Sequence, residues 1–228
     1  MHTDRTRPRR RLVVAAAVAA ATALLLGGCG SDDSAPAPSN PAAAADTTSA
    51  PGKVTWSDYR GVTVPKSTVD GPFSMTAAMV PTGYARTPQG AVLAAMQGQT
   101  RLALTPDESW SDVAQTVLTF GPGRDAYAVA RTLTSITEPA DPASTAQFAG
   151  FRVEHFDGDT ARIQLATALP DATLVAQPTE LTWYRDDWRI TLPDPATNLE
   201  DPDTGAVATD PVPLDSLDGY TRFAAQEQ

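Results

Sequence analysis

Apolar residues recur at helical spacing in three consecutive segments in the middle of the chain. In the first segment, TPQGAVLAAMQGQTRLAL, Thr87 is a good N-cap, and Pro88 takes the first helical position, where the missing N–H costs nothing. In the second, TPDESWSDVAQTVLTF, we expect Thr105 and Glu108 to form a capping box. The third, GPGRDAYAVARTLTSI, predicts a helix over residues 122–134.

The glycine of the TPQG block has two interpretations. Gly90 follows the predicted N-cap by three positions, so it would let the first turn of the helix approach a neighbouring segment closely. Alternatively, the free N–H groups of this first turn could hold a carboxylate or a phosphate. The sequence favours the structural interpretation, because the cap, the proline and the glycine explain one another.

The pattern then changes from helical spacing to alternation. The segment AQFAGFRVEHFDGDTARIQLATAL predicts two strands around the DGD turn at residues 157–159, which is a strong hairpin signal. A third strand is expected at about residues 173–184. The segment ELTWYRDDWRITLP reverses at residues 185–187, which places Trp183 and Trp188 close together across a short hairpin. Closer to the N-terminus, VTWSDYRGVTVP predicts a strand or a packed loop.

Helices that precede antiparallel strands favour an α+β fold. We therefore expect residues 53–228 to form a single α+β domain, with N-terminal helices packed on an antiparallel sheet. An acidic, proline-rich loop interrupts the pattern at residues 194–213. The segment LDGYTRF near the C-terminus is expected to dock back onto the domain through its apolar residues, which are Leu217, Tyr220 and Phe223.

The first 28 residues have the layout of a secretory signal. Five arginines lie among residues 5–11, and residues 12–26 then carry no charge. The alternative is a transmembrane helix, but this uncharged run is short, because a bilayer core needs roughly 20 apolar residues. It also ends in two glycines rather than in a basic stop signal. The arginine run loosely resembles a twin-arginine signal, so the export route stays open.

Cys29 is the only cysteine of the chain, and its neighbours explain its place. The stretch Leu26-Gly27-Gly28-Cys29 resembles the bacterial lipobox, in which a leucine and two small residues precede a lipidated cysteine. This resemblance implies that the Cys29 sulfur receives a diacylglyceryl group and that the chain is cut before Cys29, which leaves residues 1–28 as a lipoprotein signal peptide. Ordinary signal cleavage that leaves a free thiol is the alternative.

Residues 29–52 would then be the lipidated cysteine followed by a linker. Residues 30–52 contain no aromatic side chain and are rich in proline, alanine and serine, so they cannot bury enough apolar surface to fold. We expect a disordered, semi-extended spacer between the membrane and the folded domain.

Charge and composition exclude several functions. Cleavage before Cys29 removes five arginines and one aspartate, which changes the formal net charge from −10 to −14. Such a surface repels phosphate backbones, so we expect no nucleic-acid partner. The mature chain has no cysteine left for a disulfide or a zinc ligand, and His155 is its only histidine. We therefore expect no metal site, no cofactor and no catalytic residue.

Two family resemblances add to this picture. The TPQGAVLAA block, together with Gly71-Pro72 and Gly83-Tyr84-Ala85, resembles a family of uncharacterised lipoproteins of high-GC Gram-positive bacteria. The closing hairpin of Trp183 and Trp188 is similar to that of cystatin-like, nuclear-transport-factor-two-like cone domains, in which a curved antiparallel sheet wraps around helices. These resemblances imply an extracytoplasmic domain of unknown function, and related cone domains serve in conjugation and secretion assemblies.

The main functional hypothesis is a non-catalytic domain that is bound to the membrane through lipid on Cys29 and contacts a protein partner in the cell envelope. The alternative is a cone-fold domain that binds a small molecule or acts as an enzyme. That alternative requires an open pocket, for which the candidate residues are His155, Trp183, Trp188 and Tyr84. His155 could act there as a general base, whereas a solvated histidine at a strand end is the plainer interpretation.

Overall fold

The structure is a computed structural model that describes residues 44–197 and 210–223. The expected signal peptide, the lipidation site at Cys29 and most of the expected linker lie outside the described residues, as does most of the acidic loop. None of the helices in the described part of the chain has the length and apolar character that are needed to cross a bilayer.

An antiparallel sheet of six strands forms one layer of the domain, in the order β10-β5-β6-β7-β8, with β9 paired to the other end of β7. The strands are β5 (Gln147–Phe156), β6 (Thr160–Ala168), β7 (Leu174–Trp183), β8 (Trp188–Ile190), β9 (Val212–Leu214) and β10 (Thr221–Arg222). The hairpins β5–β6 and β7–β8 confirm the turns expected at residues 157–159 and 185–187, and Trp183 pairs with Trp188 across the second.

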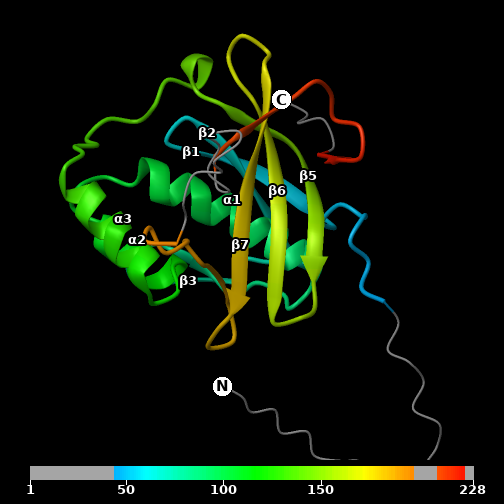
Figure 1. Cartoon of the computed structure of the whole chain (residues 1–228), viewed down its shortest axis with the longest axis horizontal. Helices are drawn as coiled ribbons and strands as arrows, with labels where there is room; N and C mark the ends of the chain where they lie inside the picture. Colours follow the sequence, from blue (N-terminus) through cyan, green and yellow to red (C-terminus); the bar gives the residue numbers. More distant parts are fainter. Residues whose placement is uncertain (1–43, 198–209, 224–228) are drawn as a thin grey trace, which may run out of the picture. The chain divides into compact units, whose positions relative to one another are not determined.

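Three α-helices occur in the described residues: α1 (Pro88–Leu104), α2 (Trp110–Val117) and α3 (Pro122–Thr132), with a short 3-10 turn η1 (Pro142–Ser144). Figure 1 shows α1 behind β6 and β7, with the hairpin of β1 (Val54–Tyr59) and β2 (Val62–Ser67) packed beside it. The helix contacts β5, β6, β7 and β8 as well as β2 and α2. The expected mixture of helices with an antiparallel sheet is thus confirmed.

Helix α1 is the centre of the core, because 13 of its 17 residues are buried. Thr87 caps it as expected, since its side chain accepts a hydrogen bond from the Gly90 N–H at 3.1 Å. A Cβ atom at Gly90 would lie 2.0 Å from the carbonyl oxygen of Ala85, so only glycine fits. These contacts confirm the structural interpretation of the TPQG block. Gly98 similarly allows Ile190 and Val117 to approach the helix.

The capping box expected at Thr105 and Glu108 is wrong. Thr105 is instead the C-cap of α1, because its N–H donates to the carbonyl of Arg101 and so still belongs to that helix. Its hydroxyl lies 2.9 Å from that of Tyr59, and a turn at Pro106 then leads to α2, whose N-cap is Ser109 without a side-chain hydrogen bond. A threonine hydroxyl can cap a helix, but in the fold the Thr105 hydroxyl pairs with the distant Tyr59 hydroxyl instead.

The C-terminal segment docks as expected. Strand β10 pairs with β5, and the Phe223 ring lies 5.4 Å from that of Phe151 and 5.5 Å from that of Trp56. The start of the domain differs from the expected linker boundary at Gly52. Gln89 donates to the carbonyls of Asp46 and Ser49, and the Gly52 N–H donates to Asp70, so these residues already lie on the domain.

Candidate functional site

The hairpin of β3 (Ser74–Met75) and β4 (Pro81–Thr82) presents an uncharged, apolar surface. From residue 71 to residue 85 the sequence GPFSMTAAMVPTGYA contains no charged side chain. Three large apolar residues of this hairpin are exposed: Phe73 (55 %), Met75 (48 %) and Met79 (68 %). Ala77 and Ala78 at the tip are exposed as well. These apolar side chains lie within residues 73–79 of one hairpin, and grouped apolar exposure marks interaction surfaces more often than scattered single residues do.

The tip of this apolar hairpin is held by its own hydrogen bonds. The Thr76 N–H donates to the carbonyl of Val80 at 2.8 Å, and the Thr76 hydroxyl accepts from the Val80 N–H at 3.1 Å. Met79 has a φ of +59°, an uncommon value for a residue with a side chain, and its N–H donates to the Thr76 carbonyl. Val80 is buried at 1 % exposure. The exposed side chains therefore project from an ordered turn.

Asp187 fastens the base of the hairpin to the sheet. Its carboxylate accepts hydrogen bonds from the backbone N–H groups of Gly83 at 2.9 Å and Tyr84 at 3.0 Å, and also from that of Trp188 at 3.0 Å. The indole N–H of Trp188 donates to the carbonyl of Ala85 at 2.9 Å. The bonds of Asp187 to Gly83 and Tyr84, and that of Trp188 to Ala85, cross about a hundred residues of sequence, so the base of the hairpin and the β7–β8 turn support each other.

The structure brings three of the four predicted pocket residues together. The rings of Trp183 and Trp188 lie 5.3 Å apart, and Arg86 lies over Trp183 at 5.4 Å. Tyr84 is buried and lines, with Trp188 and Arg101, a cavity whose free volume of about 10 Å³ has room for no more than one water molecule. Burial raises the pKa of Tyr84, and the nearby Arg101 partly opposes this shift.

His155, the fourth predicted pocket residue, lies elsewhere. Its side chain is 56 % exposed, and its Nε2 atom is 3.2 Å from the Asp157 carboxylate in the β5–β6 hairpin. Hydrogen bonds from Thr160 and Asp159 are the main reason that the pKa of Asp157 lies below its usual range, and His155 contributes least. No group of three or more His, Cys, Asp or Glu side chains that could hold a metal ion occurs in the described part of the chain.

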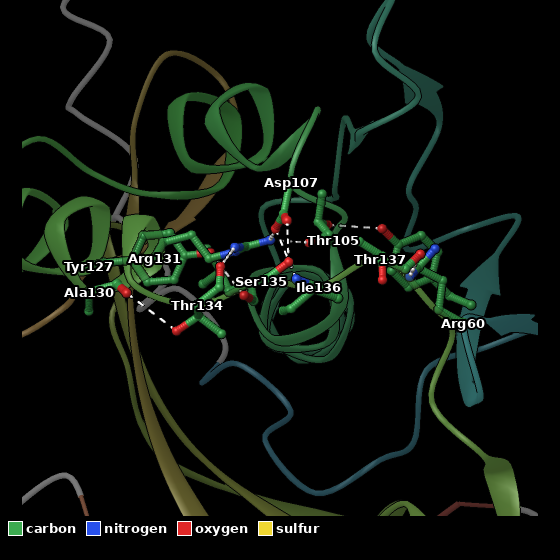
Figure 2. Close-up of polar contacts among 12 residues, drawn as sticks. Arg60, Thr105, Asp107, Tyr127, Ala130, Arg131, Thr134, Ser135, Ile136 and Thr137 are labelled. Carbon is green, nitrogen blue, oxygen red and sulfur yellow. Dashed lines mark hydrogen bonds and ion pairs between the residues drawn. The ribbon is translucent and has the colours of Figure 1, made fainter.

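A second polar cluster, shown in Figure 2, is centred on the buried Arg131 of α3. Its guanidinium donates to the Asp107 carboxylate at 2.8 Å and to the carbonyls of Thr105 at 2.8 Å and Thr134 at 2.5 Å. The N–H of Ile136, the Ser135 hydroxyl and then Arg131 lower the pKa of Asp107 to about 2. Both terminal nitrogens of the guanidinium are engaged by these acceptors, whereas its buried Nε has no hydrogen-bond partner. The cluster therefore joins two loops.

A scan against protein-family models matches residues 16–222 to a family described as Domain of unknown function (DUF8175). The chain belongs to the DUF8175 family. The matched range includes Cys29 and the apolar hairpin of the DUF8175 domain. No curated protein and no solved structure matches the chain. The expectation of a family without an assigned function is confirmed, and the lipoprotein, high-GC and cone-fold parts of the resemblance stay predictions.

Sequence reasoning overlooked the apolar hairpin. A usable signal was present, because a run of 15 uncharged residues is conspicuous in a chain with 27 acidic side chains. Such a run usually indicates a buried strand, and only the burial of Val80 and Tyr84 beside the exposure of Phe73, Met75 and Met79 shows which part faces out.

Proposed function

We propose that this protein is a non-catalytic domain, anchored by lipid on Cys29 to the extracytoplasmic face of the cell membrane, that binds a protein partner in the cell envelope through the apolar hairpin. The observation that carries the proposal is the exposure of Phe73, Met75 and Met79 on an ordered turn. Aromatic side chains and methionine are enriched at protein interfaces, whereas charged residues are depleted at interface centres.

Hydrogen bonds hold the apolar hairpin in one conformation, and this supports the proposed function. A surface that is already held in its bound shape loses little conformational entropy on association, so more of the contact energy appears as affinity. Asp187 and Val80 provide this support from the sheet side and the core side of the hairpin. The net charge of the mature chain would exclude unwanted anionic partners, while the uncharged hairpin would accept an apolar partner surface.

The proposed anchor keeps the hairpin near the membrane. The first described residue, Ala44, follows Cys29 by only 15 positions, which limits the span of this segment to about 50 Å. The family model spans the anchor and the folded domain together. We propose that the partner is another protein of the envelope, reached within this distance.

The alternative function, in which a cavity near His155 binds a small molecule or acts in catalysis, draws less support from the geometry. The cavity beside Tyr84 and Trp188 has room for one water molecule, and His155 does not line it. Catalysis would need a reactive group within reach of a bound substrate.

Replacing Phe73, Met75 and Met79 together with serine is expected to reduce partner capture at least tenfold, because truncation of central apolar side chains removes hot-spot contacts. The measurement is affinity purification of the full-length protein from crosslinked cells, followed by quantitative mass spectrometry of the recovered envelope proteins. The variant should unfold at the wild-type denaturant concentration, since the three side chains are exposed.

The matched control replaces Val129 and Leu133 of the α3 region, which are 65 % and 85 % exposed, with serine. This control should capture the same partner as the wild type. Equal capture by the hairpin variant, or the absence of any specific envelope protein from wild-type samples in repeated trials, contradicts the proposed function.

A further inference from the structure

Three arginines gather around two aromatic rings where the β7–β8 hairpin meets the loop between α2 and α3. The guanidinium carbon of Arg124 lies 4.5 Å from the ring centre of Phe120, and those of Arg185 and Arg189 lie 5.2 Å and 5.4 Å from that of Tyr184. The rings of Phe120 and Tyr184 are 6.3 Å apart in an edge-to-face arrangement. These five residues are called the arginine cluster below.

Backbone pairing brings these distant segments together. The Thr119 N–H donates to the Ile190 carbonyl at 2.9 Å, and Leu118 forms a parallel bridge with Ile190, so the α2–α3 loop runs along the edge of β8. On the neighbouring strands Arg189 is paired with Thr182, which places the two side chains on the same face of the sheet. The arginine cluster is therefore built on rigid elements.

Three threonine hydroxyls lie close to one another in a cleft next to the arginine cluster. The hydroxyl of Thr191 lies 2.9 Å from that of Thr182 and 3.2 Å from that of Thr119. These three threonines, with Phe120 and Tyr184, line an open cleft of about 420 Å³. Hydroxyl groups can donate hydrogen bonds as well as accept them, so these threonines offer donors to a bound oxyanion.

The positive charge of the arginine cluster has no carboxylate partner. No ion pair within 4.0 Å joins Arg124, Arg185 or Arg189 to an acidic side chain in the described residues. Arg189 donates instead to the carbonyls of Gln115 at 2.7 Å and Leu118 at 3.4 Å. The buried Nε of Arg189 and Nη1 of Arg124 have no acceptor at all. Buried polar groups without partners are uncommon and require an explanation.

The groups that shift the pKa of Arg189 also favour a bound anion. Burial lowers its pKa most, Asp187 and Tyr184 raise it, and the positive charges of Arg185 and Arg124 lower it further. Asp187 has a larger effect than either Arg185 or Arg124, although its oxygens also accept three backbone N–H groups at the base of the apolar hairpin. The positive charges of Arg185 and Arg124 still repel that of Arg189, and a bound anion would relieve this repulsion.

We propose that the arginine cluster, together with the adjoining cleft that its two aromatic rings line, is a binding site for a ligand that carries an oxyanion, either a phosphate ester or a carboxylate. Guanidinium groups bind both anions with paired, charge-assisted hydrogen bonds, and the aromatic rings hold the guanidinium planes in place. Although the net charge of the chain is negative, three arginines without acidic partners form a local region of positive charge that attracts an anion. This site is separate from the apolar hairpin and does not depend on the proposed partner function.

The test is a titration of the full-length protein, labelled with ¹⁵N at arginine, followed through the side-chain Nε–H signals. Inorganic phosphate and succinate are added in separate arms at constant ionic strength against chloride. Saturable shifts are expected at Arg124, Arg185 and Arg189, with no saturable shift at Arg222 on β10. Tighter binding of phosphate assigns the site to a phosphate ester, and tighter binding of succinate assigns it to a carboxylate.

The variant Arg124→Gln/Arg185→Gln should lower the affinity for the anion at least tenfold, while the control Arg222→Gln should leave this affinity unchanged. Both replaced arginines lie outside the core and leave the Arg189 bonds to α2 intact, so folding is expected to persist, as the dispersion of the amide spectrum will show. Non-saturable shifts in both arms, or an unchanged affinity in a folded double variant, overturn the proposal.

Discussion

Replacing Arg131 with methionine is expected to lower the free energy of unfolding by about 3 kcal/mol, because several hydrogen bonds to a buried charged group are lost together. The side chain is 4 % exposed, and its guanidinium joins Asp107, Thr105 and Thr134. Methionine fills a similar volume but leaves the carbonyl of the buried Thr105 without its donor. Urea denaturation, followed by tryptophan fluorescence, measures the change.

The control for Arg131 is Arg86→Met. Arg86 forms an ion pair with Asp159, donates to the carbonyl of Gly158 and lies over Trp183, but its side chain is 49 % exposed, so its loss should change stability by no more than about 1 kcal/mol. If Arg131→Met and Arg86→Met change the unfolding midpoint equally, Arg131 is not the link between the two loops of Figure 2.

Replacing Trp188 with alanine is expected to lower the free energy of unfolding by about 3–5 kcal/mol, the range for removing a buried tryptophan from a core. The side chain is 3 % exposed and packs against the rings of Trp183 and Phe156 at 5.3 Å and 5.8 Å. Its indole N–H also holds the carbonyl of Ala85 at the base of the apolar hairpin. Urea denaturation followed by far-ultraviolet circular dichroism measures the loss.

Trp188→Phe separates packing from hydrogen bonding at this position. Phenylalanine keeps most of the ring contacts but leaves the Ala85 carbonyl unpaired, so a smaller loss of about 1–3 kcal/mol is expected. A loss below about 1 kcal/mol for Trp188→Ala, within the range of surface substitutions, would show that Trp188 is not part of the core described here.

Local patterns predicted the helices and hairpins well, because their signals lie within one element. Thr87 and Pro88 start α1, and the turns at residues 157–159 and 185–187 close the two hairpins. Thr105 shows the limit of such signals. Its hydroxyl had two uses, and the tertiary contact with Tyr59 decided between them.

The position of His155 shows a second limit. Strict alternation from Phe151 through Val153 would place His155 on the core face of β5. The pairing of β5 with β6 shifts between Val153 and His155, and this irregularity brings Phe156 opposite the buried Ala161. Phe156 therefore packs on Trp188 while His155 faces outward. A shift of one residue reverses the faces of a strand, and no local signal marked it.

Local patterns showed only that residues 71–85 are uncharged, and they predicted neither which side chains of the hairpin face solvent nor the arginine cluster. The apolar hairpin depends on Asp187, about a hundred residues away, and the arginine cluster combines Arg124 with Arg185 and Arg189 from another element. Spacing in the sequence carries no information on such pairs, because they meet only when the sheet and the helices pack together.

Both surfaces belong to an account in which the domain acts at the outer side of a membrane, held there by Cys29. The most direct test of this central claim is mass spectrometry of the N-terminal peptide of protein purified from its own cells, with Cys29→Ser as the control. The account predicts that the mature chain begins at Cys29 and carries a diacylglyceryl group on the sulfur, and that the control lacks it. An unmodified Cys29 thiol, with residues 1–28 still attached or with the protein free in the medium, would contradict the account.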